Sequence, residues 1–249
     1  MGQILVTGAT GQLGRPTTSA LQNAGHEVRA MSRQPGPGRT IANLATGAGL
    51  AEAMASVETV VHLATTNGRA DLGLAERLCA ASRAARVGHL LLISIVDVDR
   101  IPLRFYRDRR RIEEIVEGSG VPYTVLRATQ FHSLLVAMFR AQRRLPVLVA
   151  PSIRVQPIAV PEVAVRLSEL AGQPPQGRVP DIGGPEQRSF GEFARTWQES
   201  VGRRRPILPL RLPGRLFAAY DAGAGLVPGP AYGKQTFADY LTSGAGSAR

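Results

Sequence analysis

The chain has 249 residues, 44% of them hydrophobic, with a formal net charge of +11 and one cysteine. This length and composition allow one sizeable core, as a single domain or a domain with a minor lobe. No run of about 18 apolar residues is present, which excludes a membrane-spanning helix, and a lone cysteine excludes an internal disulfide or a thiolate metal cluster.

The positive charge is carried almost entirely by arginine, because Lys234 is the only lysine. The arginines are spread along the chain, with clusters only at 104–111, 140–144 and 203–205. Diffuse basic charge favours solubility and attraction to anions, and it does not predict a specific nucleic-acid partner. The N-terminal residues lack the basic, apolar and small-residue order of a signal peptide, so we expect a cytoplasmic protein.

The first half of the chain alternates short apolar segments with helical patterns. The predicted strands are QILVTG (3–8), HEVRAMSR (26–33), ETVVHLAT (58–65), GHLLLIS (88–94) and PYTVLRA (122–128). The predicted helices span 14–25, 70–88 and 104–120, and Cys79 is expected to fill core space in the second of them. Near-continuous apolar strands separated by helices predict an α/β fold with a doubly wound parallel sheet.

The pattern loosens after about residue 130. Helices are predicted at 133–145 and from near Pro161, followed by a late strand near 178–183. Another helix is predicted at 189–202, with Ser189 as its N-cap and Glu192 at the spacing of a capping box. The segment from 203 onward predicts a small lobe of helices and loops over one end of the sheet.

The segment Thr7-Gly8-Ala9-Thr10-Gly11-Gln12-Leu13-Gly14 joins the first predicted strand to the first predicted helix. Gly8 allows a tight turn, Gly11 lets the backbone approach a pyrophosphate, and Gly14 lets helix and strand pack closely. The helix N-terminus offers N–H groups and a positive dipole end to phosphate. Although the spacing is G-x-x-G-x-x-G, the position between a strand and a helix indicates a dinucleotide-binding loop, with Thr10, Gln12 and Leu13 as further contacts.

The second predicted strand ends in Ser32 and Arg33. NAD-dependent enzymes usually have an acidic residue here that binds the ribose hydroxyls, whereas an arginine suits the 2′-phosphate of NADP. We therefore expect NADP(H) as the cofactor, with Arg33 as the phosphate ligand, Ser32 beside it and Arg15 as a second candidate.

These motifs, with ILVTGATGQLGRP, GHEVRAMSR, VVHLAT, VPYTVLRATQFH, DIGGPE and RTWQESVGRRRP in the same order, resemble the NmrA-like branch of the atypical short-chain dehydrogenase/reductases. The resemblance implies a Rossmann-type domain at 1–130, completed by the late strand near 178–183. It implies that 131–249 form mainly a substrate-binding lobe, integrated with the first domain in one globular unit.

Further cofactor contacts are implied by this resemblance. Asn43 and Leu44 correspond to an Asp-Leu pair beside the adenine, and asparagine keeps an acceptor without the charge. The remaining implied contacts line the adenosine ribose (Ala64, Thr65 and Thr66) and the nicotinamide (Thr129, Gln130 and Phe131).

The segment 104–114, RFYRDRRRIEE, corresponds to the catalytic helix of the family, which carries a tyrosine and a lysine four residues apart. Here Phe105 and Arg109 stand at those positions, so the expected proton donor and the lysine are both replaced. Arg109 is expected to take over the ribose contact, while Tyr106 with Arg110 restores the four-residue spacing. Ser94 corresponds to the active-site serine of the family.

Other interpretations of these residues remain open. The helix could be a charged surface, with Phe105, Ile112 and Val116 packed on the sheet and Arg109–Glu113 and Arg110–Glu114 as surface ion pairs. A nucleic-acid contact is the third interpretation. His132 could donate a proton from a strand end facing the cleft or satisfy a local hydrogen bond, His62 is expected in the core, and no residues have the spacing of metal ligands.

We therefore predict an NAD(P)H-dependent oxidoreductase that transfers hydride to a carbonyl, a quinone or a conjugated double bond of a small organic molecule. The altered tyrosine–lysine pair leaves a non-catalytic NADP(H)-binding regulator of the NmrA type as the alternative. Sugar-nucleotide epimerase or dehydratase chemistry is a third possibility that normally requires the intact pair. The oligomeric state, monomer or homodimer, is left open.

Overall fold

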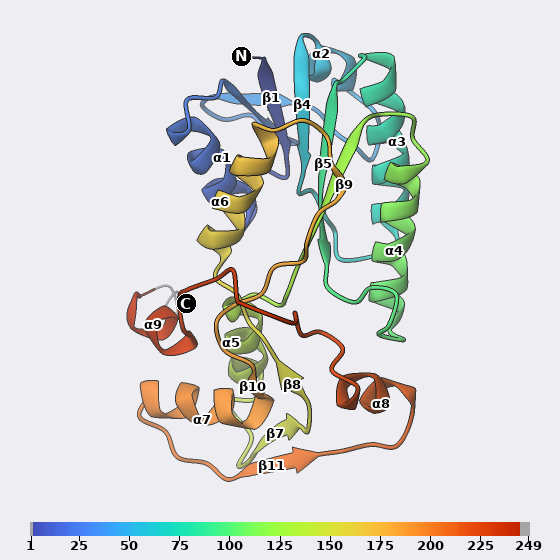
Figure 1. Cartoon of the computed structure of the whole chain (residues 1–249). Helices are drawn as coiled ribbons and strands as arrows, with labels where there is room; N and C mark the ends of the chain where they lie inside the picture. Colours follow the sequence, from blue (N-terminus) through green and yellow to red (C-terminus); the bar gives the residue numbers. More distant parts are fainter. Residues whose placement is uncertain (1, 245–249) are drawn as a thin grey trace. The chain divides into compact units, whose positions relative to one another are not determined.

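The computed structural model describes residues 2–244, which form two compact units built from alternating segments of the chain (Figure 1). Unit 1 contains residues 2–94, 104–127 and 160–180, and unit 2 contains residues 95–103, 128–159 and 181–244. The predicted domain boundary near residue 130 stays a prediction.

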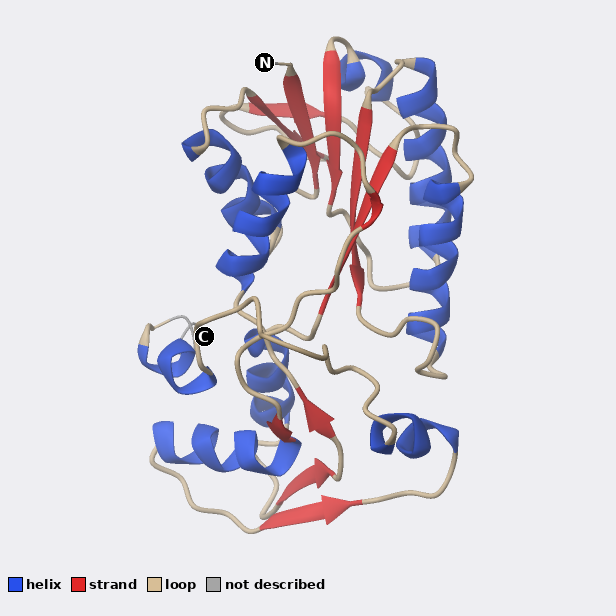
Figure 2. Ribbon diagram, in the orientation of Figure 1, coloured by secondary structure: helices blue, strands red, loops and turns tan. Residues whose placement is uncertain are grey.

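Unit 1 is built on a seven-stranded parallel sheet with the order β3-β2-β1-β4-β5-β6-β9 (Figure 2). The strands are β1 (Gln3–Thr7), β2 (Val28–Ser32), β3 (Arg39–Ile41), β4 (Val57–His62), β5 (His89–Ile95), β6 (Tyr123–Ala128) and β9 (Gly177–Arg178). This is the order of a doubly wound dinucleotide-binding sheet, and it confirms the predicted fold class.

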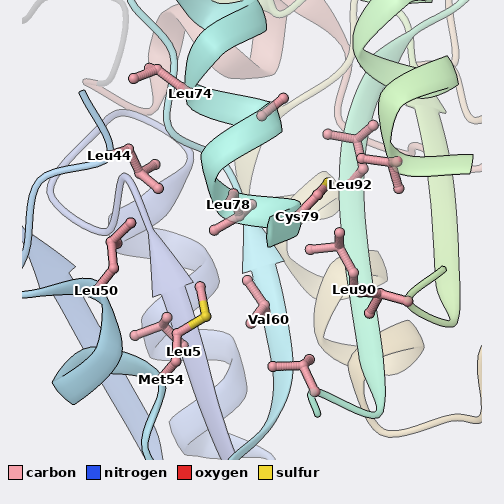
Figure 3. Packing of buried hydrophobic residues seen from close by; sticks show 14 of the residues in the cluster. Leu5, Leu44, Leu50, Met54, Val60, Leu74, Leu78, Cys79, Leu90 and Leu92 are labelled. Atoms are coloured by element: carbon pink, nitrogen blue, oxygen red, sulfur yellow. The ribbon is translucent and has the colours of Figure 1, made fainter. Parts of the chain in front are cut away.

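Helices cover both faces of this sheet. One face carries α1 (Gly14–Asn23) and α6 (Val160–Ala171), and the other carries α3 (Ala70–Ala84) and α4 (Arg104–Glu117), while the short α2 (Leu50–Met54) precedes β4 (Figure 1). Leu78 and Cys79 of α3 point toward Val60 of β4 and Leu90 of β5 (Figure 3). Cys79 is 5% exposed, so the expected core role is confirmed, and burial raises the pKa of its thiol to about 11.

Three elements of unit 1 differ from the sequence-based expectation. The segment after residue 33 was expected to be a loop, and the three-residue β3 forms within it because its backbone pairs with β2. The five-residue α2 was also not predicted, since so short a helix has no measurable periodicity. The late strand near 178–183 is reduced to the two residues of β9 and an isolated bridge between Ala128 and Ile182.

Unit 2 surrounds a second, aromatic core. Its helices are α5 (His132–Ala141), α7 (Phe190–Ser200), α8 (Arg215–Asp221) and α9 (Phe237–Thr242). Phe139 packs on Phe190 and Trp197 at ring distances of 5.0 and 5.6 Å, and Phe237 completes the cluster. The predicted capping box at the start of α7 is confirmed, because Ser189 and Glu192 bond reciprocally to each other's backbone N–H groups.

Unit 2 also contains four short strands that the sequence did not predict. β8 (Arg154–Val155) pairs with β10 (Arg188–Ser189) antiparallel, and β7 (Leu148–Pro151) pairs with β11 (Ile207–Leu210) in parallel. Strands of two to four residues carry little sequence pattern, and distant segments pair to form them. They were missed for that reason.

Two of the arginine clusters meet in unit 2 and contribute to its stability. The Arg203 side chain donates to the carbonyl of Arg143, and Arg205 donates to the carbonyls of Gln142 and Leu145. These bonds satisfy carbonyl groups just beyond the C-terminal end of α5. None of the helices within residues 2–244 combines the length and apolar character that a membrane crossing requires.

Candidate cofactor and active site

The glycine-rich loop has the local geometry that its sequence predicts. Gly8 has φ +67°, and a Cβ atom there would lie 2.8 Å from the backbone of Ala64. A Cβ atom on Gly14 would lie 2.1 Å from the carbonyl oxygen of Gly8, so only glycine allows helix α1 to start this close to the loop. At Gly11 the nearest atom would be the Gly8 oxygen at 3.2 Å, which leaves this backbone accessible to a ligand.

The hydroxyl of Thr7, which the sequence analysis left unassigned, connects the ends of β1 and β4. Its Oγ1 accepts hydrogen bonds from the backbone N–H groups of Leu63 and Ala64 at 3.2 and 3.3 Å. It also lies 2.8 Å from Nδ1 of His62, the residue paired with Thr7 in the parallel ladder. Thr7 therefore fixes the backbone that follows β4, beside the glycine-rich loop.

These contacts also define the state of His62. Because the lone pairs of the Thr7 hydroxyl accept two N–H groups, its proton is donated to Nδ1, and His62 carries its own proton on Nε2. Burial and, to a smaller extent, the positive charge of Arg109 lower the pKa of His62 to about 4. His62 is 4% exposed and neutral at physiological pH, which confirms the expectation of a core residue.

The end of β2 presents an exposed cation. Arg33 is exposed, and among residues 2–244 it has no hydrogen-bond or ion-pair partner. The Ser32 hydroxyl accepts from the backbone N–H of Gln34 at 3.2 Å. Arg15 is exposed beside the glycine-rich loop, where its Nε donates to the Thr10 carbonyl at 3.0 Å. The two arginines considered for phosphate binding therefore differ, since only Arg15 is held by the loop.

The residues expected beside the adenine are engaged within the protein. The side-chain oxygen of Asn43 accepts from the backbone N–H of Ala45 at 2.9 Å, which makes a local Asx turn. Leu44 is 4% exposed and belongs to the core of unit 1 (Figure 3). The acceptor that asparagine retains is therefore already used by the loop, and the side chain of Leu44 faces the interior.

A polar cluster joins the loop after β4 to helices α3 and α4. Asp71 accepts hydrogen bonds from Thr65 Oγ1 at 2.6 Å and from the backbone N and Oγ1 of Thr66 at 2.7 and 2.6 Å. Arg109 Nη2 donates to Asp71 Oδ2 at 2.7 Å and to Thr65 Oγ1 at 2.6 Å. Burial raises the pKa of the Asp71 carboxyl, but the bonds from Thr65 and Thr66 and the charge of Arg109 together lower it below its usual value.

This cluster determines the orientation of Arg109. The Arg109 and Asp71 side chains are 13% and 3% exposed, and the guanidinium lies 4.9 Å from the centre of the Phe105 ring. Only Nη2 is used in these bonds, so Nη1 and Nε keep N–H groups for a ligand. Asp71 was not predicted from the sequence. Its only local signal was an acid following two threonines at the start of a helix.

The structure corrects the predicted faces of α4. Tyr106 is 8% exposed and Phe105 is 37% exposed, so tyrosine and not phenylalanine joins Ile112 and Val116 on the buried face. The expected Arg109–Glu113 pair does not form. Glu113 instead binds Arg127 through two bonds, at 2.8 Å (Nε–Oε1) and 2.6 Å (Nη2–Oε2), with both side chains nearly fully buried.

Arg110 belongs to the surface of this helix. The expected pair with Glu114 is confirmed at 3.4 Å, and Arg110 also pairs with Glu113 at 3.2 Å and Glu117 at 2.9 Å. The arginine proposed as the alternative partner of Tyr106 is therefore held by three glutamates.

Ser94 near the end of β5 is a buried hydroxyl without a protein partner. It is 5% exposed, and its Oγ makes no hydrogen bond within the described part of the chain. Since buried hydroxyls are normally hydrogen-bonded, Ser94 is a candidate for a ligand contact.

Residues 129–132 belong to unit 2. Thr129 is 3% exposed, and its Oγ1, like Oε1 of Gln130, has no hydrogen-bond partner among residues 2–244. Phe131 forms a backbone bridge with Ile158. His132 is 1% exposed, lies 3.2 Å from the Gln235 carbonyl oxygen through Nε2, and stacks on Tyr240 at 5.2 Å. These contacts favour the local, structural alternative for His132.

The comparisons with known proteins agree with this geometry. Residues 8–134, which begin in the glycine-rich loop, match the family described as NAD(P)H-binding. A Streptomyces griseus protein, (4-alkanoyl-5-oxo-2,5-dihydrofuran-3-yl)methyl phosphate reductase, is 33% identical over 80% of this chain and 74% of its own. The chain belongs to the NAD(P)H-binding family.

Solved structures show the same fold at lower sequence identity. The NADPH-dependent quinone oxidoreductase of Escherichia coli in complex with NADPH has a TM-score of 0.82 at 20% identity, over 96% of this chain and 99% of that one. A nucleoside-diphosphate-sugar epimerase of Staphylococcus aureus has a TM-score of 0.78 at 20% identity, with the same coverage. At this identity the similarities indicate the fold alone.

The family match and the Streptomyces griseus relative confirm the predicted class, an NAD(P)H-dependent oxidoreductase. The solved structures confirm the Rossmann-type fold expected of the atypical short-chain dehydrogenase/reductases. Within residues 2–244 no three His, Cys, Asp or Glu side chains are grouped as metal ligands.

Proposed function

We propose that this protein is an NADPH-dependent reductase that transfers hydride to a conjugated carbon–carbon double bond of a small carbonyl compound. The proposal of a conjugated bond is supported by the Streptomyces griseus relative, whose name describes an unsaturated lactone ring bearing a further carbonyl group. Carbonyl and quinone acceptors belong to the same class of reaction, and the substrate assay below separates them.

The residues of unit 1 fit a dinucleotide. The accessible backbone at Gly11 and the first turn of α1 would hold the pyrophosphate, because the N–H groups and helix dipole favour negative charge there. The buried Ser94 hydroxyl, which no protein group satisfies, would bond to the bound cofactor or substrate. When bound, the nicotinamide supplies the hydride, while the protein binds and orients the reactants.

A preference for NADPH over NADH rests on Arg33. This exposed arginine follows β2, where an acidic residue would select the free ribose hydroxyls of NADH. With no protein partner, its guanidinium can form a bidentate contact with a 2′-phosphate.

Arg109 is proposed to hold the nicotinamide ribose in place of the family's lysine. The bonds to Asp71 and Thr65 fix one nitrogen of the guanidinium and direct the remaining N–H groups. Arginine keeps its proton at all physiological pH values, so it positions the cofactor and stabilises negative charge without shuttling protons. Proton transfer to the substrate is assigned to Tyr106, Ser94 or water.

One observation carries the proposal: the loop after β4 is bound by Thr7, beside the glycine-rich loop, and by the Asp71–Arg109 cluster. A second candidate function, a non-catalytic NADP(H)-binding regulator, is favoured by Phe105 and Arg109 at the positions of the family's catalytic tyrosine and lysine.

Calorimetry with NADPH and NADH tests the cofactor preference. Arg33→Ala is expected to weaken NADPH binding by about 1.5–3 kcal/mol, the scale of a charge-assisted contact, and to leave NADH binding unchanged. Arg111→Ala, at an exposed position of α4, is the control and is expected to change neither affinity, while Arg15→Ala tests the second candidate for the phosphate contact. Equal losses for both cofactors in Arg33→Ala would contradict the role in phosphate binding.

Turnover tests the enzyme itself. NADPH consumption is measured with a conjugated lactone, a quinone and a simple ketone, and the conjugated compound is expected to have the highest kcat/KM. Tight NADPH binding without consumption with any of the three would favour the regulator.

A further inference from the structure

An open cavity of about 190 Å³ lies within unit 1, between the start of α3 and the first turns of α4. Since one water occupies about 30 Å³ in the liquid, the cavity has room for roughly six, comparable with a phosphate group and its attached carbon. Whole small-molecule sites are typically larger, at about 300–1,000 Å³. The volume of the cavity therefore suits one part of a ligand.

The charged side chains that line this cavity carry a net positive charge. Arg69, Arg104 and Arg109 line the cavity together with Asp71 and Asp108, so the formal charge is 3 − 2 = +1. Asp71 offers little negative charge to a ligand, because its two oxygens accept four hydrogen bonds from Thr65, Thr66 and Arg109.

Arg69 and Arg104 are available to bind an anion. Among residues 2–244, the side chain of Arg69 has no hydrogen-bond or ion-pair partner. Arg104 pairs with Asp108 at 3.6 Å while its side chain is 50% exposed, and exposed pairs of this kind contribute little stability. An anion can therefore recruit both guanidinium groups without breaking a buried contact.

An aromatic wall stands beside these cations. The Phe105 ring is 37% exposed and lines the cavity, with the Arg109 guanidinium against its face. This combination suits a ligand with an anionic group next to a flat, apolar ring.

We propose that this cavity binds the phosphate monoester of the substrate, with Arg69 and Arg104 as the phosphate ligands and Phe105 against the adjoining ring. The inference rests on the proposed function, in which Arg109 lies at the nicotinamide ribose and the cavity is next to the reacting end of the cofactor. Two arginine forks, one just before α3 and one at the start of α4, match the several oxygens of a phosphate better than the two of a carboxylate.

Binding is tested on the NADPH-loaded protein with phenyl phosphate, and with phenol as its neutral analogue, by calorimetry. Arg69→Gln and Arg104→Gln are each expected to raise the Kd of phenyl phosphate about tenfold and to leave phenol unchanged. Arg111→Gln, the same change at an exposed position of α4 that does not line the cavity, is expected to change neither.

Turnover is tested with 4-(hydroxymethyl)-2(5H)-furanone and its phosphate ester. The ester is expected to have a KM about tenfold lower than the alcohol, and this advantage is expected to disappear in Arg69→Gln and Arg104→Gln at nearly constant kcat.

The subsite would be overturned if Arg69→Gln and Arg104→Gln raised the KM of ester and alcohol equally. It would also be overturned if these variants and Arg111→Gln all raised the Kd of phenyl phosphate equally. Turnover of both compounds without a preference for the ester would overturn the subsite and leave the reductase standing. Arginine-dependent binding of phenyl phosphate without turnover would support the subsite and count against the proposed reaction.

Discussion

The sharpest test of the site is the removal of the Arg109 guanidinium. In Arg109→Ala, the Asp71 carboxylate stays 3% exposed but loses its charged partner. Removing one member of a buried pair typically costs about 3–5 kcal/mol. Because Thr65 and Thr66 still donate three hydrogen bonds, we expect a loss near the lower limit, about 3 kcal/mol.

The exposed Arg111 on the same helix provides the control. Arg111→Ala is expected to change the free energy of unfolding by less than about 0.5 kcal/mol. For a chain of this size, about 3 kcal/mol corresponds to roughly 6–12 °C in Tm. Thermal and urea denaturation of the two variants, without cofactor, give the stability difference.

Cofactor affinity is measured separately at a temperature where each variant is folded. Arg109→Ala is expected to weaken NADPH binding by about 1.5–3 kcal/mol, since a charge-assisted ribose contact is lost. Arg109→Lys keeps the charge toward Asp71 and is expected to retain most of both properties. If Arg109→Ala matched Arg111→Ala in both stability and NADPH affinity, this part of α4 would be only a charged surface, and the reasoning would be refuted.

Three further predictions follow from the same helix and strand. Glu113→Gln is expected to destabilise the protein by about 3–5 kcal/mol in urea denaturation, because it removes a charged partner of the buried Arg127. The same change at the exposed neighbour, Glu114→Gln, is expected to cost less than about 0.5 kcal/mol. Equal losses of stability in the two variants would show that the buried Glu113–Arg127 pair stabilises the protein no more than the exposed pair. Tyr106→Phe separates the candidate proton donors: a large fall in kcat at unchanged NADPH affinity would assign the proton to Tyr106, and unchanged turnover would assign Tyr106 a packing role. The His62 imidazole is expected to titrate near pH 4 in NMR spectra. Because this folded-state pKa lies below the unfolded value of about 6.5, the free energy of unfolding is expected to fall by roughly 3 kcal/mol as the pH drops from about 6.5 to 4. A titration midpoint near 6.5 would contradict the buried, neutral state.

Features defined over a few consecutive residues were predictable from the sequence. The glycine spacing at 8, 11 and 14 anticipated the positive φ of Gly8 and the close approach at Gly14. The Ser189–Glu192 capping box was predicted in full, because both of its bonds join residues three positions apart. Five of the seven sheet strands were predicted close to their observed bounds, because each contains a short run of mostly apolar residues.

Pairings between distant segments could not be predicted in this way. Asp71 and Arg109 are 38 positions apart, and helical spacing instead suggested Arg109–Glu113, a pair that does not form. The packing of α4 on the sheet turns Tyr106 inward and Phe105 outward, and a rotation of the helix by a fraction of a turn is enough to exchange them.

The sequence by itself therefore determined the order of strands and helices, the dinucleotide loop and the family, because each is encoded in local residue types and periodicity. Only the tertiary structure decided which charges are buried and which are exposed. Arg109, Arg110 and Arg111 are identical in type and consecutive in the chain, yet one binds Asp71, one binds three glutamates and one is left in solvent. The difference arises because the energy of a charge depends on its burial and on the partners that other elements bring to it.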